Sequence, residues 1–490
     1  MKNQFFTFVL SGAMMLGAIT GCKPEPNLQY MVTVDFGEKT GKILKPVNGI
    51  NNGPISRSSV GGTIDLSEDY AELDIPYIRL HDTNYPSFNT VDISCIFPNF
   101  DADEKNPDNY LFHHTDELLL AIHQLGAGVI YRLGESIDGT VYKRHARAPK
   151  DFAKWSRICA NIIRHYNEGW ANGFHLDIEY WEIWNEPDIL TDDWAKNAMW
   201  AYSDPYDYFN LYLTASKFLK KEFPAIKIGG YAACGFHDNT PKHFEFFTRF
   251  LDMVKSENAP LDFFSWHVYP TFDTEKIPEK AYIVREELDK RGFTKTISVF
   301  DEWNITGFEG STENPWPHLG RSDIEGRKMR KAVFENKKNM CGASFVAAHF
   351  IIMNDIPIDI AAYYDGQPRL TWCGLWDVYG IPQKTFYAFK AYAEFARGGK
   401  ERAFVNITGS GNNLWCIDNQ STALLSSFMG GGNVEMMLKN PDKKYRKSEI
   451  YMLDDHSDLE LVRTETLKAE TTPIKLSLGK YAVVLIKLTE

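Results

Sequence analysis

Two glutamates, Glu186 and Glu302, each stand where an apolar run passes into a polar loop. Glu186 follows the run 178–184, and Glu302 follows the run 296–300. If both runs are parallel strands of one sheet, their carboxyl ends meet at the same edge, and the two side chains can face each other. A facing pair of carboxyl groups, one an acid and the other a base or a nucleophile, is the machinery of glycoside hydrolysis. The pair therefore points to that chemistry.

The elements that must position these glutamates recur between residues 40 and 396, where short apolar runs alternate with stretches of helical periodicity. Eight strands each followed by a helix predict a (β/α)8 barrel, since right-handed crossovers make it the simplest topology. A doubly wound sheet is the alternative, but no glycine-rich phosphate loop follows the first strand. The predicted strands are 47–50, 77–80, 128–133, 178–184, 226–229, 263–268, 296–300 and 343–347. The predicted helices are 115–125, 152–165, 206–223, 241–254, 278–289 and 325–336.

In such a barrel the working side chains project from the carboxyl ends of the strands. Glu186 ends the fourth predicted strand and Glu302 ends the seventh, so the barrel places both at one mouth. After the barrel, residues 397–490 show short alternating runs separated by turn formers, which is typical of an antiparallel β-sandwich. The strand at 31–36 is a candidate to join that sandwich.

The first residues are typical of a targeting segment. Lys2 precedes an apolar stretch at 5–19, and small residues then lead to Cys22. This order predicts a lipoprotein signal peptide at 1–21, an acylated Cys22 and a tether at 22–30, with a plain secretory peptide as the alternative. We therefore expect a protein exported to the bacterial envelope and attached to a membrane only through a lipid anchor.

Composition narrows the classes of partner. Of the 490 residues, 53 are Lys or Arg and 65 are Asp or Glu, so the net charge of −12 disfavours a nucleic-acid partner. Aromatic residues reach 14%, and they either fill a large core or stack on sugar rings. The seven cysteines form no CxxC pair and no zinc spacing, so we expect neither a metal nor a cofactor.

Four short motifs together resemble a known family. Trp184 to Asp188 looks like the acid/base signature of the large clan of retaining glycosidases built on this barrel. The seventh strand end, Phe300 to Asn304, looks like the nucleophile signature of the same clan. With His267-Val268-Tyr269-Pro270 and Arg79-Leu80-His81, the chain is most similar to glycoside hydrolase family 39, over roughly residues 30 to 490. That family includes β-xylosidases and α-L-iduronidases.

The resemblance implies Glu186 as acid/base and Glu302 as nucleophile of a retaining, exo-acting hydrolase that takes an oligosaccharide or glycan. Asn185 would bind the sugar 2-hydroxyl. The other candidate substrate-binding residues lie at predicted strand ends or in the following loops; they are His81, Asp82, His267, Tyr269, Trp303, Asp355 and Trp372. For all of them except Asp355 we keep an alternative role. It is a strand-end hydrogen bond for His267 and Tyr269, a brace for Arg79 for His81 and Asp82, and ordinary core for the two tryptophans.

The sequence also departs from the family pattern. Family β-xylosidases tend to carry an aromatic and an acidic residue at the end of strand eight, where we expect this chain to offer Met353, Asn354 and Asp355. Asp82 stands where a small residue is usual. These departures predict a glycone other than a simple xyloside, with β-xylosidase or α-L-arabinosidase as the alternatives. A sugar-binding lipoprotein without turnover is a further alternative, which a panel of nitrophenyl glycosides would test.

Overall fold

The computed structural model describes residues 29–490 except for 59–60, 190–192, 235–240, 312–315, 412, 441–443 and 468–469. The predicted signal peptide 1–21, Cys22 and most of the predicted tether lie outside the described residues. The last two tether residues, Gln29 and Tyr30, already belong to a strand. Across the described part of the chain, we find no helix with the length and apolar character needed to span a bilayer.

Eight parallel strands close into a barrel, which confirms the predicted fold class. In spatial order around the barrel they run β2, β5, β6, β7, β8, β9, β10 and β11, and β11 pairs back with β2. Their bounds are β2 (Gly49–Asn51), β5 (Tyr77–Leu80), β6 (Gly128–Leu133), β7 (Tyr180–Ile183), β8 (Lys227–Ala233), β9 (Phe263–Val268), β10 (Ile297–Trp303) and β11 (Ile360–Tyr363). A hairpin of β3 (Ile55–Arg57) and β4 (Thr63–Asp65) follows β2.

Helices cover the outside of the barrel, and local signals set their ends. In α4 the Asp151 carboxylate accepts a hydrogen bond from the Lys154 amide at 2.9 Å, and Gly169 ends the helix with φ of 75°. The longer helices are α3 (His113–Gln124), α4 (Phe152–Glu168), α5 (Tyr208–Glu222), α6 (Pro241–Ser256), α7 (Lys276–Lys290), α9 (Ile324–Asn336), α10 (Met340–Met353) and α11 (Lys384–Arg397). The short ones are α1 (Ser67–Glu72), α2 (Ile93–Ile96), α8 (Trp316–Leu319) and single 3-10 turns at 107–109, 194–196 and 205–207.

One predicted strand is wrong. Residues 343–347 lie inside helix α10, and the eighth strand of the barrel is β11, further along the chain. Helix α10 is buried on nearly all sides, so its sequence is apolar throughout and lacks the polar stripe of a surface helix. A short apolar run of this kind cannot be told from a buried strand by periodicity alone.

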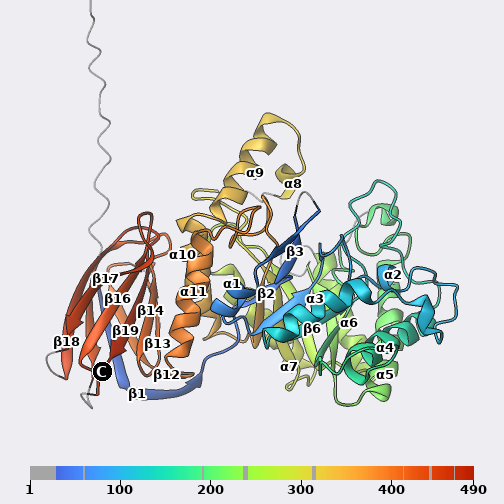
Figure 1. Ribbon diagram of the computed structural model, residues 1–490, viewed down its shortest axis with the longest axis horizontal. Helices are drawn as coiled ribbons and strands as arrows, with labels where there is room; N and C mark the ends of the chain where they lie inside the picture. The colour runs from blue at the N-terminus through green and yellow to red at the C-terminus, as the bar shows by residue number, and fades with distance from the viewer. Residues whose placement is uncertain are drawn as a thin grey trace, which may run out of the picture.

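The C-terminal part forms two packed sheets (Figure 1, red and orange, left). One sheet has the order β12-β1-β15-β18 and the other β13-β14-β19-β16-β17, and all pairs are antiparallel except β1 with β15. The bounds are β1 (Gln29–Ile43), β12 (Glu401–Gly409), β13 (Trp415–Asp418), β14 (Thr422–Ser426), β15 (Gly432–Lys439), β16 (Lys447–Leu453), β17 (Asp458–Thr466), β18 (Thr471–Leu478) and β19 (Val483–Thr489). The first described strand therefore lies in the sandwich and not in the barrel.

Helices α10 and α11 stand between the barrel and the sandwich (Figure 1). The main apolar core runs from the barrel through these helices into the facing sheet, where it includes Leu424, Phe428 and Leu485. The Phe428 ring lies 5.5 Å from Phe345 of α10 and 5.2 Å from Phe272, in the loop after β9. The two parts thus share one core at their junction.

Candidate active site

The structure brings Glu186, Glu302 and His267 together at the carboxyl ends of β7, β10 and β9. One oxygen of each carboxyl group and one nitrogen of the imidazole lie within 4.8 Å of one another. Retaining glycosidases hold their two carboxyl groups about 5–5.5 Å apart, whereas inverting enzymes leave about 6.5–9.5 Å for a water. The spacing is therefore of the retaining kind.

Two donors hold the carboxyl group of Glu302. Arg79 donates to Oε1 at 2.7 Å, and the hydroxyl of Tyr269 donates to Oε2 at 2.6 Å. Burial raises the pKa of Glu302, and Glu186 adds to this, while His267, Arg79 and Tyr269 act to lower it. The donors thus favour the carboxylate, which is the form that a nucleophile needs.

The backbone around Glu186 is held in an uncommon conformation. Trp184 and Glu186 have φ of 72° and 47°, a region that bulky residues rarely adopt. The indole of Trp184 donates to the carbonyl of Met199 at 2.8 Å, and the amide of Glu186 is shared between the carbonyls of Tyr231 and Ala232 at 3.2 Å. These contacts fix the direction in which the Glu186 side chain leaves the strand.

His267 links the two carboxyl groups. Its Nδ1 lies 2.7 Å from Glu186 Oε1 and 3.5 Å from Glu302 Oε2, and its Nε2 lies 3.4 Å from Asp301. Burial would lower the pKa of His267, but Glu302, Asp301 and Glu186 together raise it well above its ordinary value. These neighbours favour the cationic imidazole, in which Nδ1 donates a hydrogen bond to Glu186.

Arg79 forms the floor of the site. This fully buried guanidinium contacts Glu182 at 2.7 Å, Asp301 at 3.0 Å and the Asn185 side-chain oxygen at 2.7 Å, besides Glu302. Burial acts to raise the pKa of Asp301, but Arg79, Glu182 and His267 together lower it to about 2. The side-chain oxygen of Asn185 accepts a hydrogen bond from Arg79. Its buried amide nitrogen has no hydrogen-bond partner among the described residues, so it can donate to a ligand hydroxyl.

His81 and Asp82 leave β5 beside the nucleophile. His81 Nδ1 accepts from Arg132 at 3.3 Å, so we assign the ring hydrogen to Nε2, which lies 3.9 Å from Glu302 and 3.5 Å from Asp82. Burial, reinforced by Arg132, lowers the pKa of His81 well below its usual value and keeps the ring neutral. Burial also raises the pKa of Asp82, whose Oδ2 accepts from Tyr364 at 3.0 Å.

Sequence reasoning missed the loop that follows β11. There the amide of Gln367 donates to the Asp82 carbonyl at 2.9 Å and to Asp365 at 3.1 Å, and Arg369 pairs with Asp365. Tyr364, in the same loop, contacts Asp82. The signal was a Tyr-Tyr-Asp sequence after the short run 360–362, but the misplaced eighth strand hid it.

Two predicted site residues lie elsewhere. Asp355 follows α10 and pairs with Arg402 at 2.7 Å and Lys42 at 2.8 Å, so it is not at the carboxyl ends of the strands. Trp303 is fully buried and packs against Phe350 of α10, because it points outward where its neighbour Glu302 points inward. Trp372 is half-buried and lies edge-on to Tyr269 at 5.4 Å, beside the site.

Glu186, His267 and Glu302 are also the one group of described residues whose types and spacing could hold a metal ion. Both carboxyl groups are already engaged by Arg79, Tyr269 and His267. A cation would have to displace the protonated His267, so the donor set fits proton chemistry better than metal binding.

The chain is similar in sequence to proteins of a known family. The model of the family described as glycosyl hydrolases family 39 matches residues 63–307, half of the chain. A β-xylosidase of Geobacillus stearothermophilus is 31% identical over 274 residues, which cover 51% of this chain and 48% of that protein. A β-xylosidase of Caldicellulosiruptor saccharolyticus is 25% identical over 495 residues, with 92% and 88% coverage.

Solved structures support the same fold. A glucosidase from Croceicoccus marinus superposes with a TM-score of 0.74 at 20% identity, covering 95% of this chain and 99% of that one. A family 39 β-xylosidase from Caulobacter crescentus superposes with a TM-score of 0.63 at 15% identity, covering 94% of this chain and all of that one. At these identities the likeness speaks for the fold alone.

Proposed function

The chain belongs to glycosyl hydrolases family 39, and we propose that it is a retaining exo-glycosidase that releases terminal sugars from oligo- or polysaccharides by double displacement. One observation carries the proposal: oxygens of Glu186 and Glu302 lie within 4.8 Å of each other, with Glu186 bonded to His267 and Glu302 held by Arg79 and Tyr269. A carbohydrate-binding protein without turnover would have no use for this pair.

In the first step a Glu302 oxygen attacks the anomeric carbon and forms a glycosyl ester, while the bond to the leaving oxygen breaks. Glu186 gives its proton to that oxygen, so the aglycone leaves as an alcohol. Glu186 is then a carboxylate 2.7 Å from the cationic His267, which stabilises the new charge.

In the second step water attacks the anomeric carbon from the side that the aglycone left. Glu186 takes the water proton, and Glu302 departs as a carboxylate into the hydrogen bonds of Arg79 and Tyr269. The unspent amide of Asn185 would donate to the sugar 2-hydroxyl, a contact that strengthens in the transition state. Two inversions at one carbon give net retention.

The position of β11 removes the reason to expect a glycone other than a xyloside. Its loop supplies Tyr364 and Asp365, an aromatic and an acidic residue, so the supposed departure from family xylosidases at this strand does not exist. Asp82 remains as the departure from the family pattern. With Asp82 beside the nucleophile and Arg369 neutralised by Asp365, we propose a neutral glycone, with a β-xyloside as the first to test and an arabinoside next.

The test is a panel of nitrophenyl glycosides followed by proton NMR of the first-formed anomer. We expect turnover of at least one neutral β-glycoside with retained configuration. An inverted product would overturn the double displacement, and the absence of turnover on the whole panel would favour the binding-only alternative.

For the location of the protein, we propose export and a lipid anchor on Cys22, on the strength of the first 22 residues alone. Radiolabelled palmitate supplied to expressing bacteria should label the protein, and Cys22→Ser should lose the label and leave the membrane fraction. Equal labelling of the variant would contradict the anchor.

A further inference from the structure

The position of Glu186 defines the side on which the leaving group must lie. An exo-acting enzyme buries the terminal sugar, and the rest of the substrate passes the proton donor on its way out. The loop that follows Glu186 and the neighbouring loop after β6 therefore flank the aglycone. This inference rests on the proposed function and concerns what these two loops bind.

Backbone contacts tie the two loops to the site. The amide of Ile137 donates to Oδ1 of Asp82 at 3.1 Å, and the next amide, of Asp138, donates to the carbonyl of Ala198 at 2.9 Å. Met199 then accepts from the Trp184 indole, two residues before Glu186. A continuous chain of hydrogen bonds thus runs from the glycone pocket to the segment 198–199.

After that segment the chain reaches the surface at Tyr202, whose backbone conformation is uncommon. Trp200 and Ala201 are fully buried, and the Ala201 amide donates to the Ala146 carbonyl at 2.6 Å. Tyr202 follows with φ of 62° and with 47% of its surface exposed. A bulky residue in this conformation is uncommon, and here it turns an aromatic side chain out to solvent.

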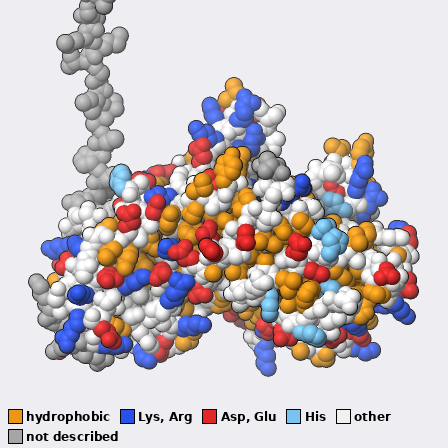
Figure 2. All heavy atoms as spheres, in the orientation of Figure 1, with side chains coloured by type: hydrophobic (Ala, Val, Ile, Leu, Met, Phe, Trp, Pro, Cys, Tyr) orange, Lys and Arg blue, Asp and Glu red, His pale blue; other side chains and the backbone are white. Residues whose placement is uncertain are grey.

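A cation lies over the Tyr202 ring. The guanidinium of Arg147 lies 4.5 Å from its centroid, and Arg147 is itself held by a hydrogen bond to the Lys143 carbonyl at 2.9 Å. Four further apolar side chains of these loops are exposed: Ile137 at 43%, Val141 at 84%, Tyr142 at 71% and Trp194 at 46%. In Figure 2 hydrophobic side chains lie on the surface at the upper right of the molecule, where Figure 1 draws the teal loops.

Exposed apolar side chains that gather into one patch mark ligand-binding or protein-binding surfaces. The apolar face of a sugar ring fits a flat aromatic surface, and the Arg147 guanidinium offers donors to its hydroxyls. We propose that Tyr202, Trp194, Ile137 and Arg147 form an acceptor ridge that binds the sugar on the leaving-group side of the scissile bond. The natural substrate is then an oligosaccharide and not the glycoside of a small alcohol.

The test compares two substrates that share the glycone which the nitrophenyl panel selects. One is its methyl β-glycoside, which has no aglycone ring, and the other is its β-1,4-linked disaccharide. We expect Tyr202→Ala to lower the ratio of kcat/KM for the disaccharide to kcat/KM for the methyl glycoside about tenfold, whereas Tyr202→Trp keeps the ratio near that of the native chain. Trp194→Ala should lower the ratio in the same direction.

A matched control is Tyr282→Ala, which removes another tyrosine with 56% exposure from helix α7 on the outside of the barrel. It should leave the ratio unchanged. An unchanged ratio in both Tyr202→Ala and Trp194→Ala would overturn the ridge, as would equal losses on the two substrates. If the native chain cleaves neither substrate, the proposed function fails instead, so the two failures are distinguishable.

Discussion

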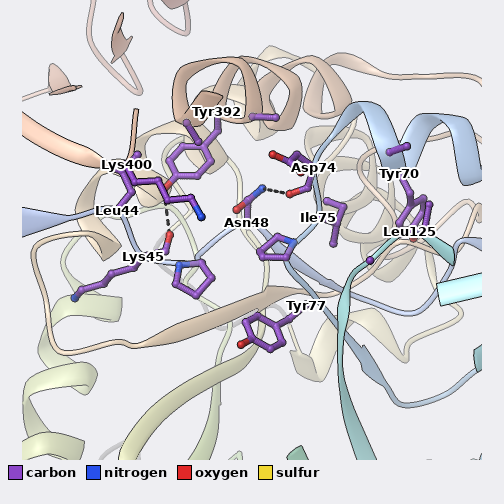
Figure 3. Close-up of a pocket in the computed structure, with 16 residues that line it drawn as sticks. Leu44, Lys45, Asn48, Tyr70, Asp74, Ile75, Tyr77, Leu125, Tyr392 and Lys400 are labelled. Atoms are coloured by element: carbon purple, nitrogen blue, oxygen red, sulfur yellow. Dashed lines mark hydrogen bonds between the residues drawn. The ribbon is translucent and has the colours of Figure 1, made fainter. Parts of the chain in front are cut away.

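The two ends of the barrel differ in whether their buried polar side chains have hydrogen-bond partners. At the carboxyl ends of the strands, Asn185 and His81 each keep a buried nitrogen without a hydrogen-bond partner among the described residues. At the opposite end lies a cavity of about 470 Å³, bordered by the chain that enters β2 and by α11 (Figure 3). There the Asn48 amide faces the carbonyls of Leu73 and Asp74, and Lys45 donates to the Ile356 carbonyl at 2.6 Å.

The difference shows that a cavity by itself does not identify a site. The cavity at the amino ends of the strands, here called the lower cavity, is roomy, but Asn48 and Lys45 are bonded to backbone carbonyls. Among the described residues that line it, Asp74 alone carries a carboxyl group. At the carboxyl ends of the strands, here called the upper end, opposite charges and donors without partners among the described residues lie close together. Reactivity should therefore depend on the upper end, and the lower end should contribute only stability.

The largest expected effect is that of Glu302→Gln, which removes the nucleophile while keeping its shape. We expect kcat to fall by at least about 10⁴-fold. Lys400→Ala, at the rim of the lower cavity, is the control and should keep kcat within about twofold. Rates on the best nitrophenyl glycoside decide the matter, and substantial residual activity in the glutamine variant would remove Glu302 from its role.

Glu186→Ala should act more selectively. Loss of the proton donor should slow glycosides of poor leaving groups by about 10²–10⁴-fold, and glycosides of acidic phenols by much less in the first step. Added azide, which needs no base, should restore turnover and yield a glycosyl azide of retained configuration. An azide product of inverted configuration would instead identify Glu186 as the nucleophile.

Tyr269→Phe should change the pH dependence. The variant loses a donor that lowers the pKa of Glu302, so that pKa rises further. The carboxylate then forms at higher pH, and the acidic limb of the kcat/KM profile should move upward by about one pH unit. Tyr392→Phe, which removes a hydroxyl bonded to Asn354 near the lower cavity, should leave the limb in place. A downward shift in Tyr269→Phe would contradict this role for the hydroxyl.

The smallest effect is expected from Asp355→Asn. This residue lies outside the site, so kcat/KM should not change. Burial opposes its charge, but Arg402 and Lys42 lower the pKa of Asp355, so its ion pairs stabilise the fold above the ordinary carboxyl pKa and cease to do so as pH falls below about 4. Its side chain is 44% exposed, which limits the loss to about 1 kcal/mol or less, about 1 °C in Tm at pH 7. A drop in activity without a drop in Tm would return Asp355 to the site.

The sequence predicted the barrel and the meeting of Glu186 and Glu302 at one end of it. Both predictions rest on a local signal, a short apolar run that ends in a polar residue. Sequence reasoning failed at Trp303, although the alternation of a strand would have turned that ring outward from the position of Glu302. It also missed Tyr364 and Arg369, because the apolar α10 resembled the strand that should precede them. A helix buried all round carries no pattern that reveals its neighbours, so only the packing could reveal the loop after β11.

The placement of β1 has a consequence for how the chain folds. Tyr30 pairs with Gly409 and also with Val434, so the first strand cannot pair until residues about four hundred positions further along the chain have been synthesised. A contact of such long sequence separation forms slowly and late. The barrel can assemble while the chain emerges, but the sandwich closes only when the last strands arrive. The barrel and the sandwich consequently do not fold independently one after the other, since the sandwich is complete only when β1 from the beginning of the chain has paired.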